Sequence, residues 1–272
     1  MVVKLDWQGQ VGKEWAIRAD GLDQLLGPVG QAGIKALGDV ARKRVLDVGC
    51  GAGSTSRALS ALGADVTGVD ISRDLLELAK QNKTEKYILT DASCDPLDGP
   101  YDAVYSRFGA MFFDDPTAGW AHIRAQSGAD SKLSIVSWCD ANDNGWASIP
   151  MNAARPILGP EKTQLAPSTL PGPFAWADPE YFGKILRDAG WQNLQWTAVD
   201  RLAEITTGDN PDPIERAVLF SCRIGILARH MAGVSDEIRE QVASALRLAY
   251  QDYLIGNAVR VPTKAWIITG TS

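Results

Sequence analysis

Three glycines at alternate positions separate an apolar run from a helical pattern. Residues 45–48 are apolar apart from one acid, and Gly49, Gly51 and Gly53 follow them directly. Glycines in such a turn let the backbone bend sharply and approach a ligand where a Cβ atom would collide. The helix that follows presents unpaired N–H groups at its first turn. The pattern therefore predicts the floor of a binding site for a nucleoside-like ligand.

The spacing of these glycines distinguishes between nucleoside-like ligands. The dinucleotide fingerprint places glycines at its first, third and sixth positions, and the sixth position here is Ser54. The phosphate loop of ATP and GTP enzymes needs a Gly-Lys-Ser/Thr triplet, which does not occur in the sequence. Binding of a dinucleotide and binding of ATP or GTP are therefore both disfavoured. Asp47 followed by Gly49, Gly51 and Gly53 resembles the first motif of the class I S-adenosylmethionine (SAM) methyltransferases.

Polar side chains end the next three strand-like runs. Asp70 closes the second run, where a carboxylate can accept hydrogen bonds from both hydroxyls of a ribose. The resemblance implies that Asp91 and Ala92 bind the adenine amino group and that Ser106 lies beside the methionine part. One acid at a strand end is more often a helix cap or a turn former, but this ordered series behind a glycine turn favours a cofactor site.

The resemblance thus implies SAM as the cofactor and S-adenosylhomocysteine (SAH) as its product. The expected cofactor-binding residues are Asp47, Gly49, Cys50, Gly51, Gly53, Asp70, Ile71, Asp91, Ala92 and Ser106.

Motifs beyond the cofactor site extend the resemblance. Residues 106–113 with Asp115-Pro116, and residues 171–174 with 177–179, resemble a bacterial subgroup that is broadly similar to the C-methyltransferases of ubiquinone and menaquinone biosynthesis. Two features depart from that pattern. Residues 126–130 replace the usual Pro-Gly-Gly loop, which should alter a turn and little else. Asp114 stands where a small neutral residue is expected and would bring negative charge near the sulfonium.

Aromatic and basic side chains are the candidates for the acceptor site. Trp7, Trp15, Trp138 and Trp146 could form an aromatic wall that favours a planar or prenylated acceptor and stabilises the sulfonium, although most tryptophans are core residues. Arg107 could bind an acidic or phenolate oxygen, or could form a structural ion pair. The expected substrate-lining residues are Trp7, Trp15, Arg107, Met111, Trp138, Trp146 and His230.

Methyl transfer is an in-line displacement, so the protein must mainly align the acceptor and exclude water. A general base is therefore optional, and no catalytic residue is assigned. His122 lies in an expected helix and is interpreted as a surface or packing residue. The Asn/Asp-Pro-Pro-aromatic signature of amine methylation is absent after the fourth run. Amine methylation of the DNA type is therefore disfavoured.

Strands and helices alternate between residues 43 and 138, which predicts an α/β, Rossmann-like fold. The resemblance implies a seven-stranded, mostly parallel sheet with helices on both faces and an antiparallel last strand next to the sixth. The expected strands cover 45–48, 66–71, 87–92, 101–106, 133–138, 194–199 and 265–269, and the expected helices cover 54–62, 72–81, 117–125 and 178–189.

The remaining segments are expected to extend this core within a single domain, residues 1–272. Residues 1–42 should form an N-terminal helical extension, with helical spacing over 11–41 that is broken near Gly27-Pro28. Residues 139–177 show no sustained period and are interpreted as an insertion over the site. Residues 200–262 form the second expected cap insertion, in which 211–255 read as two amphipathic helices.

Composition excludes several classes of partner. The net charge of −6 argues against a nucleic acid, which would need a stripe of Lys and Arg. The four cysteines are widely spaced and only two histidines occur, so neither zinc nor a disulfide framework is indicated. Residues 1–7 lack an apolar signal core, and no run has the roughly 20 residues of a transmembrane helix. We expect a cytoplasmic protein, while its oligomeric state is not indicated.

These observations predict a SAM-dependent methyltransferase that acts on carbon or oxygen of a small apolar or aromatic acceptor. One alternative is a different SAM-dependent reaction on the same fold. Another is a SAM- or nucleoside-binding protein without catalysis, because a fold does not guarantee a reaction. A nicotinamide dehydrogenase is a third alternative, since Asp70 suits its ribose contact but the glycine spacing does not.

Overall fold

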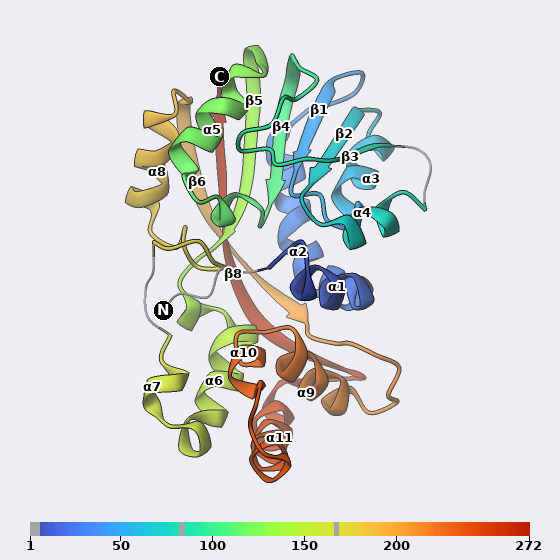
Figure 1. The fold of residues 1–272 in the computed structure, drawn as a ribbon, viewed down its shortest axis with the longest axis vertical. Helices are drawn as coiled ribbons and strands as arrows, with labels where there is room; N and C mark the ends of the chain where they lie inside the picture. Colours follow the sequence, from blue (N-terminus) through green and yellow to red (C-terminus); the bar gives the residue numbers. More distant parts are fainter. Residues whose placement is uncertain (1–5, 82–84, 166–168) are drawn as a thin grey trace.

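The computed structural model describes residues 6–81, 85–165 and 169–272, and its centre is a twisted, mostly parallel sheet (Figure 1). The strand order is β3-β2-β1-β4-β5-β8-β6, with β7 paired to β8 as a hairpin. Strands β1 to β5 are parallel, whereas β8 runs antiparallel to both β5 and β6. The strands are β1 (Arg44–Val48), β2 (Asp65–Asp70), β3 (Lys86–Leu89), β4 (Tyr101–Arg107), β5 (Ser127–Trp138), β6 (Gln192–Glu204), β7 (Leu254–Ile255) and β8 (Ala258–Thr271). The predicted Rossmann-like α/β fold, with its antiparallel strand between the fifth and sixth, is confirmed.

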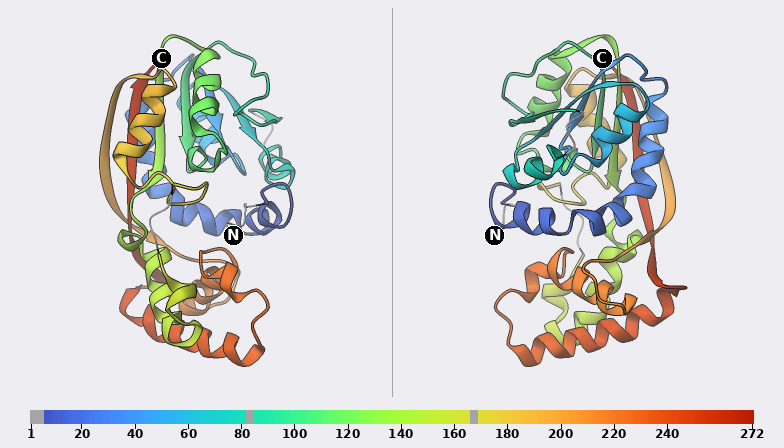
Figure 2. Two further views of the ribbon diagram at one scale, coloured as in Figure 1. Left: turned by 60° about the vertical axis from the view of Figure 1, so that its left-hand side comes forward. Right: turned by 90° about the vertical axis from the view of Figure 1, so that its right-hand side faces the viewer.

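Helices cover both faces of this sheet, which explains why most residues of its central strands β1 and β4 are buried. Helices α2 and α3 contact each other on one face, and α5 and α8 contact each other on the opposite face (Figures 1 and 2). Helix α4 packs on β2 and β3 and also contacts α1. The helices of this region are α1 (Gln10–Ile17), α2 (Ala19–Leu37), α3 (Ser54–Ala61), α4 (Arg73–Ala79), α5 (Pro116–Ala125) and α8 (Pro179–Asp188), and the short 3₁₀ helix η1 covers Ala110–Phe112.

Side-chain caps fix where three of these helices begin. Ser72, Asp115 and Asp178 each accept a hydrogen bond from a backbone N–H in the first turn of α4, α5 and α8. Pro116 and Pro179 occupy the first turn of α5 and α8, where no intrahelical N–H bond is lost. The helices predicted at 72–81, 117–125 and 178–189 are confirmed within a few residues.

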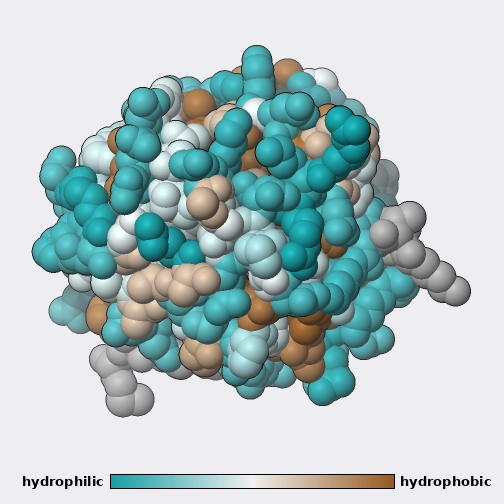
Figure 3. Space-filling view, turned by 90° about the horizontal axis from the view of Figure 1, so that it is seen from above, coloured by the Kyte–Doolittle hydropathy of each residue, from teal (hydrophilic) through white to brown (hydrophobic). Residues whose placement is uncertain are grey.

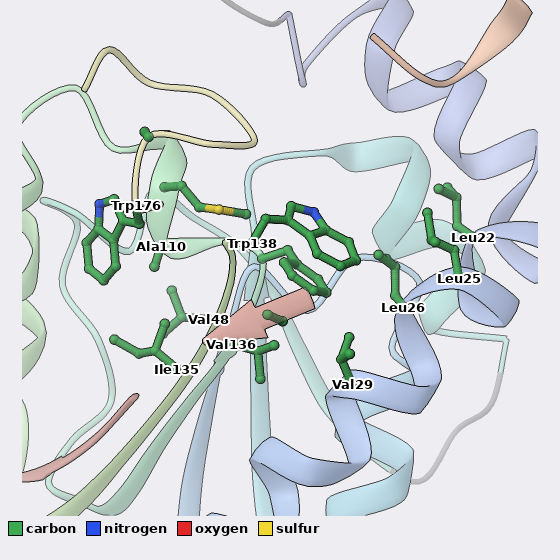
Figure 4. Packing of buried hydrophobic residues seen from close by; sticks show 14 of the residues in the cluster. Leu22, Leu25, Leu26, Val29, Val48, Ala110, Ile135, Val136, Trp138 and Trp176 are labelled. Atoms are coloured by element: carbon green, nitrogen blue, oxygen red, sulfur yellow. The ribbon is translucent and has the colours of Figure 1, made fainter. Parts of the chain in front are cut away.

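The predicted break near Gly27-Pro28 is wrong, because α2 runs through both residues. The chain instead changes direction at Arg18, between α1 and α2. Pro28 costs α2 one backbone hydrogen bond. The buried face of the helix compensates, because its apolar side chains pack on the sheet near Trp138 (Figure 4). That face consists of Leu22, Leu25, Leu26, Val29, Gly30, Gly33 and Leu37.

Residues 127–130 do not form the expected loop but belong to β5, which begins six residues earlier than predicted. The pairing of β5 with β4 shifts register between Tyr101 and Ala103. Asp130 adopts a φ of +61° within this irregular stretch. A bulge of this kind lets an irregular, polar sequence join the strand.

Helices from two insertions form a lobe beyond the carboxyl ends of the parallel strands (Figure 1). Strands β6 and β8 are long enough to enter this lobe, so the segment between the two strands covers 205–257. Asn144 ties the first insertion to β8, because its side chain bonds both the N–H and the carbonyl of Lys264. The lobe contains η2 (Ala141–Asp143), α6 (Gly145–Leu158), α7 (Pro160–Thr163), α9 (Pro213–Arg223), α10 (Ala228–Met231), α11 (Asp236–Tyr250) and η3 (Gln251–Tyr253).

The sequence shows no sustained period over 139–177, yet α6 extends over fourteen residues there. Pro150 and Pro156 lie inside α6 and conceal its helical period. Packing against α11 stabilises the helix despite them. The two helices predicted over 211–255 correspond to α9 and α11, with the short α10 between them.

The opposite end of the molecule, at the amino ends of the parallel strands, is mostly hydrophilic, with hydrophobic residues scattered across it (Figure 3). Among the described residues, no helix is long and apolar enough to cross a bilayer. The expectation that residues 1–7 lack a signal core concerns mainly residues 1–5, which lie outside the described ranges. Residues 166–168 of the first insertion also lie outside these ranges.

Candidate functional site

A cavity of about 230 Å³ lies at the carboxyl ends of the parallel strands. It is placed where the strand order reverses between β1 and β4, the usual ligand site of open α/β sheets. The turn before α1, α1 itself and the start of α2 cover it with Trp7, Trp15 and Leu22. Of the predicted cofactor-binding residues, those that line it are Gly49, Cys50, Gly51, Asp70, Ile71, Asp91 and Ala92.

The glycine turn between β1 and α3 forms the floor of this cavity. Gly49, Gly51 and Gly53 have φ values of +70°, +54° and +80°, which strain any residue with a Cβ atom. A Cβ atom on Gly53 would lie 2.4 Å from the hydroxyl of Tyr87, whereas one on Gly51 would meet no protein atom within 4 Å. The space beside Gly51 is therefore cavity space, a cradle that a side chain would fill.

Asp70 stands at the tip of β2 with both carboxylate oxygens anchored. Oδ2 accepts a 2.8 Å hydrogen bond from the N–H of Gly51, and Oδ1 accepts one of the same length from the N–H of Ser72. Burial raises the pKa of Asp70, and these hydrogen bonds oppose that shift. A carboxylate has about four acceptor positions. The acceptor positions that remain on Asp70 can accept hydrogen bonds from two hydroxyl groups of a ligand in the cavity.

Asp91 lies beyond β3 and also faces this cavity. Its Oδ1 accepts hydrogen bonds from the N–H of Ser93 at 2.9 Å and from the Ser93 hydroxyl at 2.6 Å. These bonds fix the direction of the carboxylate and leave Oδ2 to accept further hydrogen bonds. The neighbouring Ala92 is buried and supplies an apolar surface suited to a flat ring.

Three of the predicted cofactor residues lie behind the cavity wall. Asp47 is fully buried, and its Oδ2 accepts hydrogen bonds from the hydroxyls of Thr55 and Ser56 at 2.7 and 2.6 Å. Burial raises its pKa. The Ser106 hydroxyl donates to the carbonyl of Val48 at 2.9 Å. Asp47, Gly53 and Ser106 therefore hold the turn and the strand ends in place, and none of them lines the cavity.

A second cavity of about 400 Å³ adjoins the first and reaches the lobe. The residues that line both are Trp7, Trp15, Leu22, Leu26, Phe108 and Phe112. Phe108 stacks on Trp138 with a centroid distance of 4.0 Å, and Trp138 contacts Trp146 at 5.4 Å. All four predicted tryptophans and Met111 line this second cavity. The aromatic wall predicted from the sequence is therefore present.

Two of the predicted substrate-lining residues, Arg107 and His230, do not line the second cavity. Arg107 forms an ion pair with Asp23 at 2.9 Å and also donates to the Ser54 hydroxyl, so the structural ion pair left open by the sequence is present. It still lines the first cavity. His230 lies on α10 outside both cavities, and its pKa is lowered by burial and nearby positive charge. His122 donates a hydrogen bond from Nε2 to the Asp95 carbonyl at 2.8 Å, as expected for a packing residue.

Several residues that line the two cavities belong to no sequence motif and were therefore not predicted as site residues. Asp23, Leu22 and Leu26 come from α2, whose course through Pro28 was not predicted. Arg223 and Arg229 come from the lobe, more than 80 residues beyond Trp138. Asp114 does line the first cavity, as its unusual position suggested. Across the described ranges, no group of three or more potential ligands is placed to hold a metal ion.

Residues 46–125, from within β1 to the end of α5, match the family described as a methyltransferase domain. With this match, the fold and the glycine-lined cavity are those of a methyltransferase that uses S-adenosylmethionine. The residues suit the cofactor because Asp70 offers free acceptor positions and Gly51 leaves a cradle beside it.

Two proteins of related sequence are methyltransferases whose names refer to quinones. The chain is 26% identical over 175 residues to demethylmenaquinone methyltransferase of Renibacterium salmoninarum, an overlap of 60% of this chain and 72% of that protein. It is 34% identical over 100 residues to ubiquinone biosynthesis O-methyltransferase of Xanthomonas oryzae pv. oryzae, where it spans 34% of this chain and 42% of the relative. These are relatives of the quinone methyltransferase kind that the sequence resembled.

Solved structures share the fold over most of the chain. A putative methyltransferase of an antibiotic biosynthesis pathway from Anabaena variabilis gives a TM-score of 0.61 at 14% identity, covering 92% of this chain and all of that one. Phosphoethanolamine N-methyltransferase 2 of Haemonchus contortus, solved in complex with S-adenosyl-L-methionine, gives 0.55 at 16% identity, covering 100% of this chain and 60% of that one. At these identities the likeness shows the fold alone.

Proposed function

We propose that this methyltransferase transfers the methyl group of SAM to carbon or oxygen of a small apolar or aromatic acceptor. The observation that carries the proposal is the second cavity, which opens beside the cofactor site and is walled by aromatic side chains. Its volume of about 400 Å³ falls within the range of small-molecule sites, roughly 300–1,000 Å³. The names of the quinone-pathway relatives support an acceptor of this kind.

The cofactor half of the site holds the nucleoside through groups that are already fixed. We assign the ribose hydroxyls to Asp70, the adenine to Asp91 and Ala92, and the methionine part to the turn at Gly49 and Gly51. When bound, SAM supplies a methyl group on a positively charged sulfur. Backbone N–H bonds hold Asp70 in its binding position before the ligand arrives, which reduces the ordering cost of binding.

The shared wall of the two cavities is suited to orient the acceptor. Trp7 contacts Trp15 and Phe112 edge to face, with centroid distances of 4.9 and 5.1 Å. Aromatic faces attract a cation and exclude water, and both effects favour an in-line displacement. Orientation of this kind can lower the barrier by roughly 7–11 kcal/mol. The acceptor's electron pair forms the new bond to the methyl carbon, the carbon–sulfur bond breaks towards sulfur, and the acceptor proton leaves to solvent.

Methyl transfer to a panel of phenols, quinols and matched aromatic amines tests this proposal. SAM and each acceptor are incubated with the protein, and SAH and the methylated product are measured by mass spectrometry. We expect stoichiometric SAH and product with at least one phenol or quinol. Tight SAH binding with no product from any acceptor would favour a binding protein without catalysis, and product from the amines alone would contradict the proposed acceptor atom.

Replacing Trp15 with alanine should lower turnover far more than stability. Trp15 lines both cavities and is only partly buried, so its loss opens the wall between cofactor and acceptor. We expect a fall in kcat/KM of about tenfold or more, because a cation–π contact to the sulfonium contributes about 0.5–2 kcal/mol before any loss of orientation. Ile17→Ala is the matched control, since Ile17 ends the same helix and is 74% exposed. Equal losses of turnover and of thermal stability in Trp15→Ala would refute this role.

A further inference from the structure

The second cavity has a wall that does not face the cofactor. The end of α9 and the segment up to α10 supply this wall, and none of its residues lines the first cavity. In the ribbon, α9 and α10 lie below α1, which separates them from the sheet ends above it (Figure 1). The residues of this wall are Phe220, Arg223, Ile224, Gly225, Ile226, Ala228, Arg229 and Ala232.

Two guanidinium groups in this wall have no anionic partner. Within the described ranges, neither Arg223 nor Arg229 forms an ion pair or a side-chain hydrogen bond. Other arginines of the lobe do: Arg247 pairs with Glu215 and Glu240, and Arg216 bonds Thr206 and three carbonyls. The two arginines that line the cavity are thus left for a ligand.

The charge balance at this wall is positive although the protein as a whole is negative. Glu14 lines the same cavity, but its carboxylate is held by Arg18 and by the side-chain amide of Gln10. Burial alone lowers the pKa of Arg229, and no carboxylate near it opposes the shift. Arg229 is an exposed residue that also lines the cavity, so an anion can reach it from there. A guanidinium group without a partner is stabilised when an anion binds it through charge-assisted hydrogen bonds.

Two hydrogen-bond donors in the cavity also lack acceptors. The indole Nε1 atoms of Trp7 and Trp146 are buried, and neither has a hydrogen-bond partner among the described residues. Both tryptophans line the second cavity. A buried N–H without an acceptor is costly, so an oxygen-bearing ligand would be favoured here over a pure hydrocarbon.

We propose that the methyl acceptor is an aromatic or apolar carboxylic acid whose carboxylate binds Arg229 and Arg223. Its apolar body then lies against Trp138, Trp146 and Phe220, and the methylated atom is at the opposite end, beside the cofactor. This inference rests on the proposed function and specifies its acceptor. Because both arginines lie in the lobe, the lobe selects the substrate while the sheet binds the cofactor.

Calorimetric titration of acid and amide pairs into the SAH-saturated protein tests this inference. One pair is 6-hydroxy-2-naphthoate and its primary amide. In the two other pairs, a phenyl or a biphenyl group replaces the naphthalene, and the acid is again compared with its primary amide. We expect at least one acid to bind about tenfold or more tightly than its amide, the usual scale for a charge-assisted hydrogen bond. The preference should disappear in Arg229→Met and weaken in Arg223→Met. Arg229→Lys should retain part of it.

Arg260→Met is the matched control, because Arg260 is an exposed residue of β8 outside both cavities. It should leave the preference for the acid unchanged. Equal affinity for acid and amide in all three pairs, including no binding of either, would overturn the inference. SAH binding is measured in the same samples, so failure of the cofactor site is seen separately. If only neutral acceptors were methylated, the proposed function would stand. The inference that the acceptor is a carboxylic acid would then be refuted.

Discussion

Replacement of Asp70 by alanine is expected to weaken the binding of SAM and SAH about 100-fold or more. The carboxylate has acceptor positions left for two ribose hydroxyls after it has bonded the N–H groups of Gly51 and Ser72. Hydrogen bonds to a charged group contribute about 1.5–3 kcal/mol each, and each 1.4 kcal/mol is a factor of ten in affinity. Isothermal titration calorimetry with SAH measures the change directly.

Asp65→Ala is the matched control for this variant. Asp65 begins the same strand that Asp70 ends, and its side chain is exposed at the far end of the sheet. Its replacement should leave the affinity within about twofold, because surface substitutions away from a site have small effects. Circular dichroism and thermal unfolding verify that both variants fold. A folded Asp70→Ala protein with the wild-type affinity would contradict the ribose assignment.

Alanine substitutions at two glycines of the same turn are expected to separate cofactor binding from stability. At Gly51 a Cβ atom meets no protein atom but enters the cradle, so affinity for SAH should fall about tenfold or more while stability falls by about 1–2 kcal/mol from the positive φ. At Gly53 the Cβ atom would lie 2.4 Å from the Tyr87 hydroxyl and 3.0 Å from the Ala79 Cβ. There we expect a loss of about 2–4 kcal/mol in the free energy of unfolding.

Urea unfolding and SAH titration of the two variants, side by side, measure both quantities. The account requires that Gly51→Ala lose more affinity and Gly53→Ala lose more stability. Wild-type SAH affinity in Gly51→Ala would show that the ligand does not approach the turn. A fully stable Gly53→Ala would show that Tyr87 and α4 move aside more easily than their packing indicates.

The parallel half of the sheet could be predicted from sequence because its signals are local. An apolar run and a glycine turn lead into α3, and strands and helices then alternate as far as α5; each element of this series was placed within a few residues. The cofactor side of the site depends on strand ends, so Asp70, Asp91, Gly49 and Gly51 were found together in one cavity.

The rest of the structure depends on tertiary packing, which a local sequence pattern does not indicate. Helix α2 continues through Pro28, and α6 forms around Pro150 and Pro156, because buried apolar faces outweigh the missing hydrogen bonds. Strand β5 takes in residues 127–130 because a bulge matches them to β4. Arg223 and Arg229 reach the acceptor cavity only through the fold of the lobe.

The central claim is that the glycine-lined cavity binds the SAM nucleoside, and calorimetric titration of the purified protein tests it most directly. SAM, SAH and, as a control, NADH are titrated under the same conditions. We predict micromolar binding of SAM and SAH at one site per chain and none of NADH, whose fingerprint glycine is replaced by Ser54. Binding of NADH alone, or of none of the three, would contradict the claim.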